Sequence, residues 1–263
     1  MYEFDYHKPA SLGDAAKLLS DEDVKLVAGG MTLIPTLKQR LAKPSDLVDL
    51  ATIDGLRGIK EEGAGLTVGA MTRHADVHRS DVVKRVIPAL AALAGMIGDP
   101  AVRNRGTIGG SIANNDPAAD YPSAVVGLGA TVITTKREIL GDDFFTGLFE
   151  TALGQDEIIT AVKFPKPQAA AYQKFRNPAS RYAIVGVFVA RTGSGVRVAV
   201  TGAGPCVFRV PEMEAALAKS FSADAIKDIA IPDEGLNSDI HASAEYRAHL
   251  VNVMARRAVA ACA

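Results

Sequence analysis

Two segments of this sequence decide its fold: Ala28-Gly29-Gly30-Met31-Thr32 and Thr107-Ile108-Gly109-Gly110-Ser111. Each places a glycine pair beside hydroxyl residues, and the first directly follows an apolar run. Glycines remove Cβ atoms where a chain turns, which leaves consecutive amide groups free to converge on an anion. The hydroxyls of these segments can add hydrogen bonds to phosphate oxygens without a full charge. The pattern therefore predicts two turns that embrace a pyrophosphate from both sides.

The alternative for each glycine pair is an ordinary tight turn, and one isolated pair would favour that interpretation. A second segment of the same build strengthens the phosphate hypothesis. Other nucleotide motifs do not compete with it, because the sequence has no G-x-G-x-x-G opening a βαβ unit and no G-x-x-x-x-G-K-[ST]. The segment Gly202-Ala203-Gly204-Pro205 is a poor candidate, since Pro205 and Cys206 interrupt the dinucleotide fingerprint.

The first glycine segment lies within a small α/β unit, which we assign to residues 1–55. Ser11, with Asp14 three residues later, predicts the capped start of a short helix. Apolar runs at 24–28 and 46–50 predict strands on either side of the glycine pair.

The second glycine segment lies within a unit that we assign to residues 56–167. Its apolar runs with strand character are 66–70, 131–135 and 157–164. A helical pattern extends from 82 to 97, and we expect Pro88 to bend or split it. Residues 98–117 are dense in Gly, Asn, Asp and Pro, which predicts an irregular and often functional loop.

A linker, Pro165-Lys166-Pro167, separates these units from a third at 168–263. There, Thr192-Gly193-Ser194-Gly195 predicts a hairpin turn between two apolar runs, and helical patterns follow. Because strands and helices segregate instead of alternating, the sequence predicts an α+β fold and not a doubly wound parallel sheet.

Four charged or titratable positions have open roles. Asp120 either caps the helix that follows it or accepts hydrogen bonds from sugar or ribityl hydroxyls. Lys174 and its basic neighbours form either a charged surface loop or a cationic wall against a cofactor. His74 and His78 stand four apart without a third ligand, which favours a solvated or capping role over a metal site.

Composition excludes several classes of function. The net charge of -1 gives no electrostatic attraction to nucleic acid or an anionic membrane. Two distant cysteines lack metal-site spacing, and no apolar run approaches the ~18 residues of a membrane span. The N-terminus has no signal-peptide pattern, so we expect a cytoplasmic protein. No catalytic triad or acid pair is evident, and redox chemistry would therefore depend on a cofactor.

The glycine segments and their surroundings, 28–35 and 107–120, strongly resemble the FAD-binding medium subunit of molybdenum hydroxylases, the carbon monoxide dehydrogenase and xanthine dehydrogenase family. The resemblance extends over nearly the whole chain, from 4–9 to 200–203. It implies a vanillyl-alcohol-oxidase (PCMH) type FAD-binding fold, made of an N-terminal α/β subdomain and a middle subdomain, followed by a C-terminal α+β domain.

The same resemblance implies which residues contact FAD. The expected contacts are Ala28, Gly29, Gly30, Met31, Thr32, Leu33, Ile97, Thr107, Gly109, Gly110, Ser111, Asp120, Ile159, Lys174 and Tyr182. The two glycine segments would hold the pyrophosphate, Asp120 would meet sugar or ribityl hydroxyls, and Tyr182 would lie beside the isoalloxazine. Family members often have Asn where Ser111 stands, and a small polar residue or His where Met31 stands. The methionine side chain cannot form a strong hydrogen bond, so at that position we expect a contact through the backbone.

By resemblance, this chain's flavin receives electrons from [2Fe-2S] clusters on a small subunit and passes them to an external acceptor. Substrate would be oxidised at a molybdenum-pterin centre on a large subunit, within a dimer of heterotrimers. Two alternatives remain: a self-contained flavin oxidoreductase of the same fold, and an assembly subunit that binds no cofactor. We expect neither catalytic side chains nor metal ligands on this chain.

Overall fold

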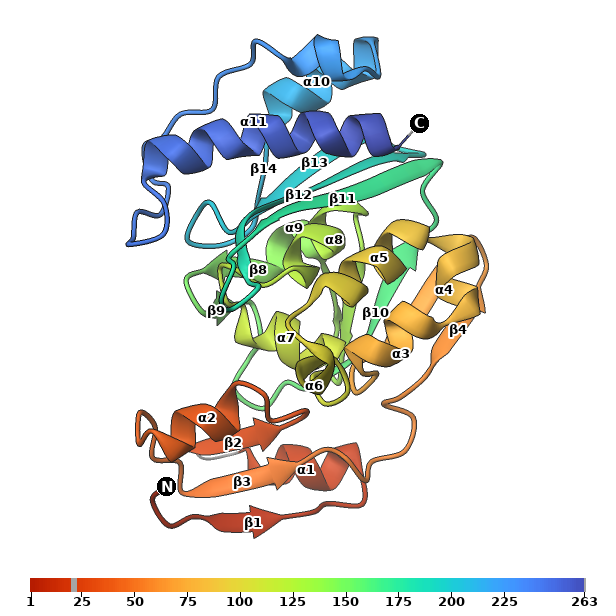
Figure 1. Cartoon of the computed structure of the whole chain (residues 1–263). Helices are drawn as coiled ribbons and strands as arrows, with labels where there is room; N and C mark the ends of the chain where they lie inside the picture. The colour runs from red at the N-terminus through yellow and green to blue at the C-terminus, as the bar shows by residue number, and fades with distance from the viewer. Residues whose placement is uncertain (20–22, 263) are drawn as a thin grey trace.

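The computed structural model describes residues 1–19 and 23–262. Its sheets follow one another from the N-terminal end of the molecule to the C-terminal end (Figure 1). A small parallel sheet lies at one end, an antiparallel sheet with its helices lies in the middle, and a second antiparallel sheet with the long C-terminal helix lies at the other end. The expected mixture of helix and strand is therefore confirmed.

The N-terminal sheet contains three parallel strands in the order β1-β3-β2. Its strands and helices are β1 (Asp5–His7), α1 (Leu12–Leu18), β2 (Val24–Val27), α2 (Leu33–Lys38) and β3 (Asp46–Asp49). Ser11 caps α1 as predicted, because its hydroxyl accepts a hydrogen bond from the Asp14 amide at 3.1 Å. The core of this sheet also takes in Leu56, Met71 and Ile158 from the middle of the chain, so the sheet packs on the middle sheet and its helices.

The middle sheet has five antiparallel strands in the order β4-β5-β10-β6-β7. They are β4 (Ile59–Glu62), β5 (Gly65–Gly69), β6 (Thr131–Thr134), β7 (Glu138–Leu140) and β10 (Ile159–Pro165), and a separate ribbon pairs β8 (Phe145–Gly147) with β9 (Glu150–Thr151). The central strand, β10, comes last of the five in the sequence. It pairs with β5 on one side and β6 on the other, and so joins the early and late parts of this stretch in one sheet.

Short helices occupy the sequence between β5 and β6, and one more follows β7. They are α3 (His74–Arg79), α4 (Asp81–Val86), α5 (Pro88–Met96), α6 (Pro100–Arg103), α7 (Ile108–Asn114), α8 (Tyr121–Gly127) and α9 (Gly141–Phe144). The helical pattern at 82–97 is split at Pro88, as predicted, because Pro88 has no N–H to continue α4 and instead becomes the first residue of α5.

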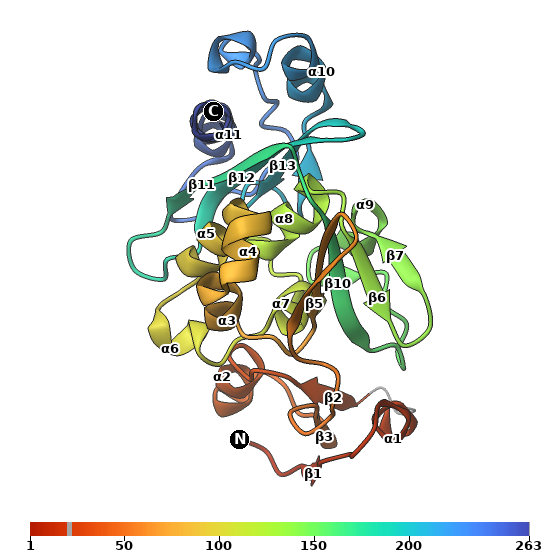
Figure 2. The same cartoon turned by 90° about the vertical axis from the view of Figure 1, so that its right-hand side faces the viewer.

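The C-terminal sheet has the order β11-β12-β13-β14. Its elements are β11 (Ala169–Arg176), β12 (Ala183–Thr192), β13 (Gly195–Thr201), β14 (Phe208–Arg209), α10 (Pro211–Lys219), the 3-10 helix η1 (Ala223–Ile226) and α11 (Ala244–Ala261). The predicted hairpin is present, with Thr192 paired to Gly195. Figure 2 shows α11 on one side of this sheet and α5 and α8 on the other, so the sheet also contacts the middle helices.

No helix among residues 1–19 and 23–262 combines the length and the apolar character that a bilayer span requires.

Candidate functional site

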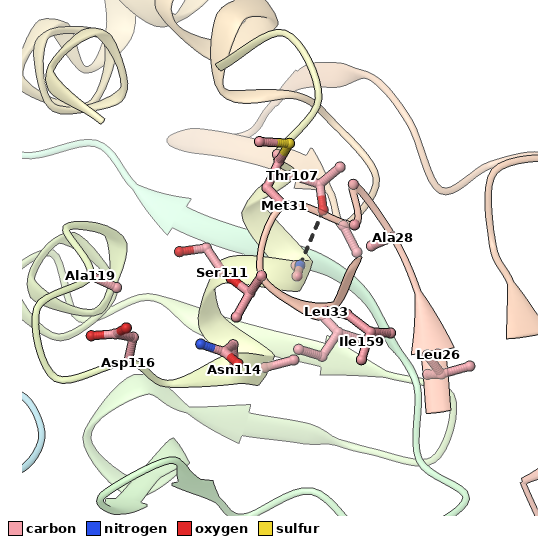
Figure 3. Close-up of a pocket in the computed structure, with 18 of the residues that line it drawn as sticks. Leu26, Ala28, Met31, Leu33, Thr107, Ser111, Asn114, Asp116, Ala119 and Ile159 are labelled. Atoms are coloured by element: carbon pink, nitrogen blue, oxygen red, sulfur yellow. Dashed lines mark hydrogen bonds between the residues drawn. The ribbon is translucent and has the colours of Figure 1, made fainter. Parts of the chain in front are cut away.

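A cavity of about 520 Å³ opens between the N-terminal sheet and the helices of the middle sheet. Figure 3 shows that both glycine segments border it, with Met31 and Leu33 from one and Thr107 and Ser111 from the other. The predicted contact residues that line it are Ala28, Gly29, Gly30, Met31, Thr32, Leu33, Ile97, Thr107, Gly109, Gly110, Ser111, Asp120, Ile159 and Tyr182. The structure thus brings together all of the predicted residues except Lys174.

The first glycine segment is a turn between β2 and α2. Gly30 has φ +70, a conformation that glycine adopts at little cost. Gly29 has another reason to be glycine, since a Cβ there would lie 2.2 Å from the carbonyl oxygen of Arg105. The backbone therefore passes directly against the segment that leads into α7.

The amide groups of residues 29–33 donate to no acceptor in the described part of the chain. The Thr32 side chain does not cap α2 either. Amides that border a cavity without an internal acceptor are available to a ligand, and successive amides of this kind favour an anion.

The second glycine segment is not the turn that the sequence predicted. Gly109 and Gly110 lie in the first turn of α7, and Thr107 is its N-cap, with its hydroxyl accepting from the Gly110 amide at 3.2 Å (Figure 3). The Gly109 amide donates to Ala70 O at 2.8 Å, and the Ser111 amide donates to Thr107 O at 3.0 Å. The prediction of free consecutive amides here was wrong, because Thr107 at the start of α7 and Ala70, the residue after β5, already accept hydrogen bonds from them.

The two glycines of this segment instead allow close packing. A Cβ on Gly109 would lie 2.6 Å from the Ala70 Cβ. A Cβ on Gly110 would lie 3.0 Å from the Thr107 hydroxyl and 3.3 Å from the Ala28 Cβ. The Ser111 hydroxyl has no hydrogen-bond partner among the described residues, which leaves it available to a ligand in the cavity.

Asp120 lies in the cavity wall at the start of α8. Its side chain does not cap the helix, so that alternative was wrong. One carboxylate oxygen lies 2.8 Å from the Lys174 ammonium, and the other accepts a hydrogen bond from the Tyr172 hydroxyl. Burial raises the pKa of Asp120, while the charge and hydrogen bond of Lys174 oppose that rise.

Lys174 lies behind Asp120 and not in the cavity wall. Its side chain is 1% exposed and also donates to Met96 O at 3.2 Å. The sequence context predicted either a surface loop or a cationic wall against the cofactor. Neither describes this buried position behind Asp120. The pairing with Asp120 could not be expected from the sequence because the two residues are 54 positions apart.

Tyr182 stands where two cavities meet. It lines the large cavity and also a second one of about 470 Å³, and the two share Asp116 and Ser180. The residue is 45% exposed, and partial burial, followed by the charges of Asp116 and Asp120, raises the pKa of Tyr182. Its phenol therefore stays protonated at neutral pH and can donate a hydrogen bond.

His74 is a lining residue that the sequence misassigned. It is 4% exposed, so the predicted solvated or capping role was wrong. Burial, with a smaller contribution from Arg103, lowers the pKa of His74 to about 4. Its Nδ1 has no hydrogen-bond partner in the part of the chain that the structure describes, and its ring centroid lies 5.3 Å from that of Tyr121. The sequence signal that could have indicated burial is the position of His74 shortly after a buried strand.

In the described part of the chain, no group of three or more His, Cys, Asp or Glu side chains is placed to hold a metal ion. The chemistry of this site must therefore be read from its cavity and its donors. The cavity is largely apolar, with free backbone amides at one side and a buried carboxylate in its wall. This combination defines a cofactor-binding protein whose ligand carries phosphate and hydroxyl groups.

Comparison with known proteins identifies the family. Residues 2–167 match the family model described as "FAD binding domain in molybdopterin dehydrogenase", and residues 170–262 match "CO dehydrogenase flavoprotein C-terminal domain". This chain belongs to that family of flavoprotein subunits, and FAD is its cofactor. It is thus the flavoprotein component of an oxidoreductase, with an electron-transfer role.

Individual relatives match along almost their full length. The nicotine 6-hydroxylase medium subunit of Paenarthrobacter nicotinovorans is 38% identical, over 97% of this chain and 95% of its own. The carbon monoxide dehydrogenase medium chain of Hydrogenophaga pseudoflava is 35% identical, over 97% of this chain and 96% of its own. A solved structure of carbon monoxide dehydrogenase from Hydrogenophaga pseudoflava superimposes with a TM-score of 0.90, at 35% identity, covering 99% of this chain and 97% of that one. The predicted resemblance and fold are confirmed.

Proposed function

We propose that this chain holds FAD in the cavity between the two glycine segments and relays electrons through it within a larger complex. Electrons would arrive from [2Fe-2S] clusters on a small subunit, after substrate oxidation at a molybdenum-pterin centre on a large subunit, and would leave to an external acceptor. The observation that carries this proposal is the row of free amides at 29–33, which faces the start of α7 across one cavity.

The first glycine segment is the principal holder of the pyrophosphate. Its free amides supply donors, and the Thr32 hydroxyl adds one more. Met31, a residue that is 36% exposed, would contribute its backbone alone. From the second segment, the Ser111 hydroxyl is the available donor, and Gly109 and Gly110 allow the start of α7 to pack closely against Ala70 and Ala28.

The remaining predicted contacts would hold the rest of FAD. Ile97 and Ile159 give the cavity apolar wall, which suits an aromatic ring. Asp120 would accept hydrogen bonds from sugar or ribityl hydroxyls. Tyr182, at the junction with the second cavity, would lie beside the isoalloxazine. The chemistry that FAD supplies is electron transfer, and the protein's task is to bind, orient and shield it.

We assign the N-terminal FAD-binding subdomain to 1–55, the middle subdomain to 56–167 and the C-terminal domain to 168–263. The separate sheets of the three stretches support this division. We further place the chain in the cytoplasm, in a dimer of heterotrimers with the iron-sulfur and molybdenum subunits. The names of the relatives, which are medium chains and subunits of larger enzymes, support a heteromeric assembly.

Metal and flavin analysis of the native assembly tests this function. The protein is captured through a tag on this chain from its own host, and FAD, iron and molybdenum are measured per chain. We expect one FAD with stoichiometric iron and molybdenum, and bleaching of the flavin on addition of the complex's substrate. A stable assembly without FAD would instead support a cofactor-free assembly subunit. Flavin reduction by the isolated chain with a small substrate would support a self-contained oxidoreductase.

A further inference from the structure

Asp120, Tyr172 and Lys174 form a buried cluster that joins two parts of the fold. Asp120 stands at the start of α8, and the other two stand on β11. The Lys174 ammonium lies 2.8 Å from one carboxylate oxygen, and the Tyr172 hydroxyl donates to the other. The side chains of Asp120 and Lys174 are 4% and 1% exposed, and Tyr172 is 3% exposed.

The packing around this cluster fixes its geometry. The Tyr172 hydroxyl would lie 2.2 Å from a Cβ on Gly186, so the neighbouring strand β12 leaves room for it only because it carries glycine there. The Tyr172 ring is stacked on Phe188 with 6.2 Å between centroids. Lys174 is held at a second point by Met96 O, 3.2 Å away. Both donors are therefore aimed at Asp120 by the C-terminal sheet.

Of these three side chains, Asp120 alone lines the cavity, within the described residues. A buried carboxylate without a cation would take up a proton and lose its strength as an acceptor. The charge and hydrogen bond of the Lys174 ammonium oppose this uptake of a proton by Asp120. Burial and the charge of Asp120 raise the pKa of Tyr172 well above its usual value, so its hydroxyl stays a donor. Each carboxylate oxygen still has a second lone pair for a hydroxyl in the cavity.

We propose that Tyr172 and Lys174 are positioning residues for FAD that act on the cofactor only through Asp120. They hold its carboxylate ionised and aim it at the hydroxyls of the bound cofactor. This inference rests on the proposed function, and it changes the expected role of Lys174 from a direct contact to a support behind the cavity wall. It also gives the C-terminal sheet a part in cofactor binding beyond the residues that line the cavity.

A pair of matched tyrosine variants tests the role of Tyr172. Tyr172→Phe removes the hydroxyl and keeps the ring, and FAD should bind about ten-fold more weakly because Asp120 loses one of its two fixed donors. Tyr121→Phe is the control, since Tyr121 follows Asp120 in the sequence and its buried hydroxyl has no hydrogen-bond partner among the described residues. It should leave the dissociation constant of FAD within about two-fold. Equal effects of the two substitutions would overturn the proposal.

A double-mutant cycle tests whether Lys174 acts through Asp120. The dissociation constant of FAD is measured by flavin fluorescence for the wild type, Lys174→Met, Asp120→Asn and the double variant, with the melting temperature of each FAD-free chain. Lys174→Met alone should weaken binding about ten-fold or more, but should change it less than about two-fold when Asp120 is already Asn. Additive effects would show that Lys174 acts on FAD binding independently of Asp120 and would overturn the proposal. Absence of FAD binding in the wild type would refute the proposed function itself.

Discussion

At Gly29 the first glycine segment packs directly against the backbone of Arg105 and Gly106, and Gly29→Ala tests this contact. A Cβ at this position would lie 2.2 Å from the Arg105 carbonyl oxygen and 2.8 Å from the Gly106 Cα. An ordinary carbon-oxygen contact is about 3.3 Å, so the two backbones must separate by roughly 1 Å. Both obstacles are backbone atoms, and no side-chain rotation can relieve the overlap.

The cost of this overlap should appear in FAD binding. Overpacking of this kind costs about 1–3 kcal/mol. The FAD-free chain can relax by moving the first glycine segment away from Arg105, and bound FAD must bring it back. The dissociation constant of FAD should therefore rise between roughly 5-fold and 150-fold. Fluorescence titration of the FAD-free chain measures this change.

Gly13→Ala provides the control for this substitution. Gly13 lies in α1, and a Cβ there would meet only the Ser11 hydroxyl, at 3.8 Å. Alanine should leave FAD binding unchanged and should stabilise the helix by about 0.5–1 kcal/mol. If Gly29→Ala bound FAD with the wild-type dissociation constant and melted at the wild-type temperature, the backbone contact between the two segments would be refuted.

Three further substitutions test other parts of the site and fold. Gly110→Val should leave the purified chain colourless, because its methyl groups would enter the space beside Ala28; a yellow Gly110→Val protein would contradict this. The pKa of His74 falls to about 4 on folding, whereas an unfolded histidine titrates near ~6.5, so the unfolded chain binds the proton first as pH falls. The free energy of unfolding should therefore be full above pH ~6.5 and fall by up to about 3 kcal/mol toward pH 4. His74→Gln should flatten this dependence in urea titrations at several pH values, and an unchanged slope would disprove it. Ser11→Ala removes the cap on the Asp14 amide and should cost about 1 kcal/mol in urea unfolding without a change in FAD affinity; a loss of FAD would show that α1 has a role at the site.

The predictions that depended on neighbouring residues were the reliable ones. Ser11 caps the helix that begins at the next residue by accepting from the amide three residues later, and Pro88 starts a helix because of its own missing N–H. The hairpin at 192–195 follows from glycine at its turn. Each of these signals acts within a few residues, so the sequence contains all of the necessary information.

For the second glycine segment, the sequence correctly predicted a position at the cavity but wrongly predicted a turn where the structure has the start of α7. A Thr two residues before Gly-Gly suits a turn, but the same Thr also suits an N-cap. The deciding acceptors for its amides are Ala70 O and Thr72 O, on a segment more than 30 residues earlier in the chain. A local pattern cannot show that these amides are already engaged.

The charged residues of the site were the hardest to predict because their partners are distant. Asp120 was assigned to a cap or a sugar hydroxyl, yet its nearest partners are on β11. His74 was expected in solvent, and tertiary packing against Tyr121 buries it instead. Burial and long-range pairing are set by the assembled fold, and one sequence contains no direct signal for either.

Comparison of FAD with riboflavin tests the central claim most directly. Riboflavin keeps the isoalloxazine and the ribityl chain but lacks the adenosine and the pyrophosphate that the free amides at 29–33 are proposed to hold. The FAD-free chain is titrated with each ligand, and binding is followed by flavin fluorescence. We expect one FAD per chain and an affinity for riboflavin at least about 100-fold lower, since even two hydrogen bonds to a charged phosphate account for that ratio. Equal affinities for the two ligands, or no binding of FAD, would contradict the account.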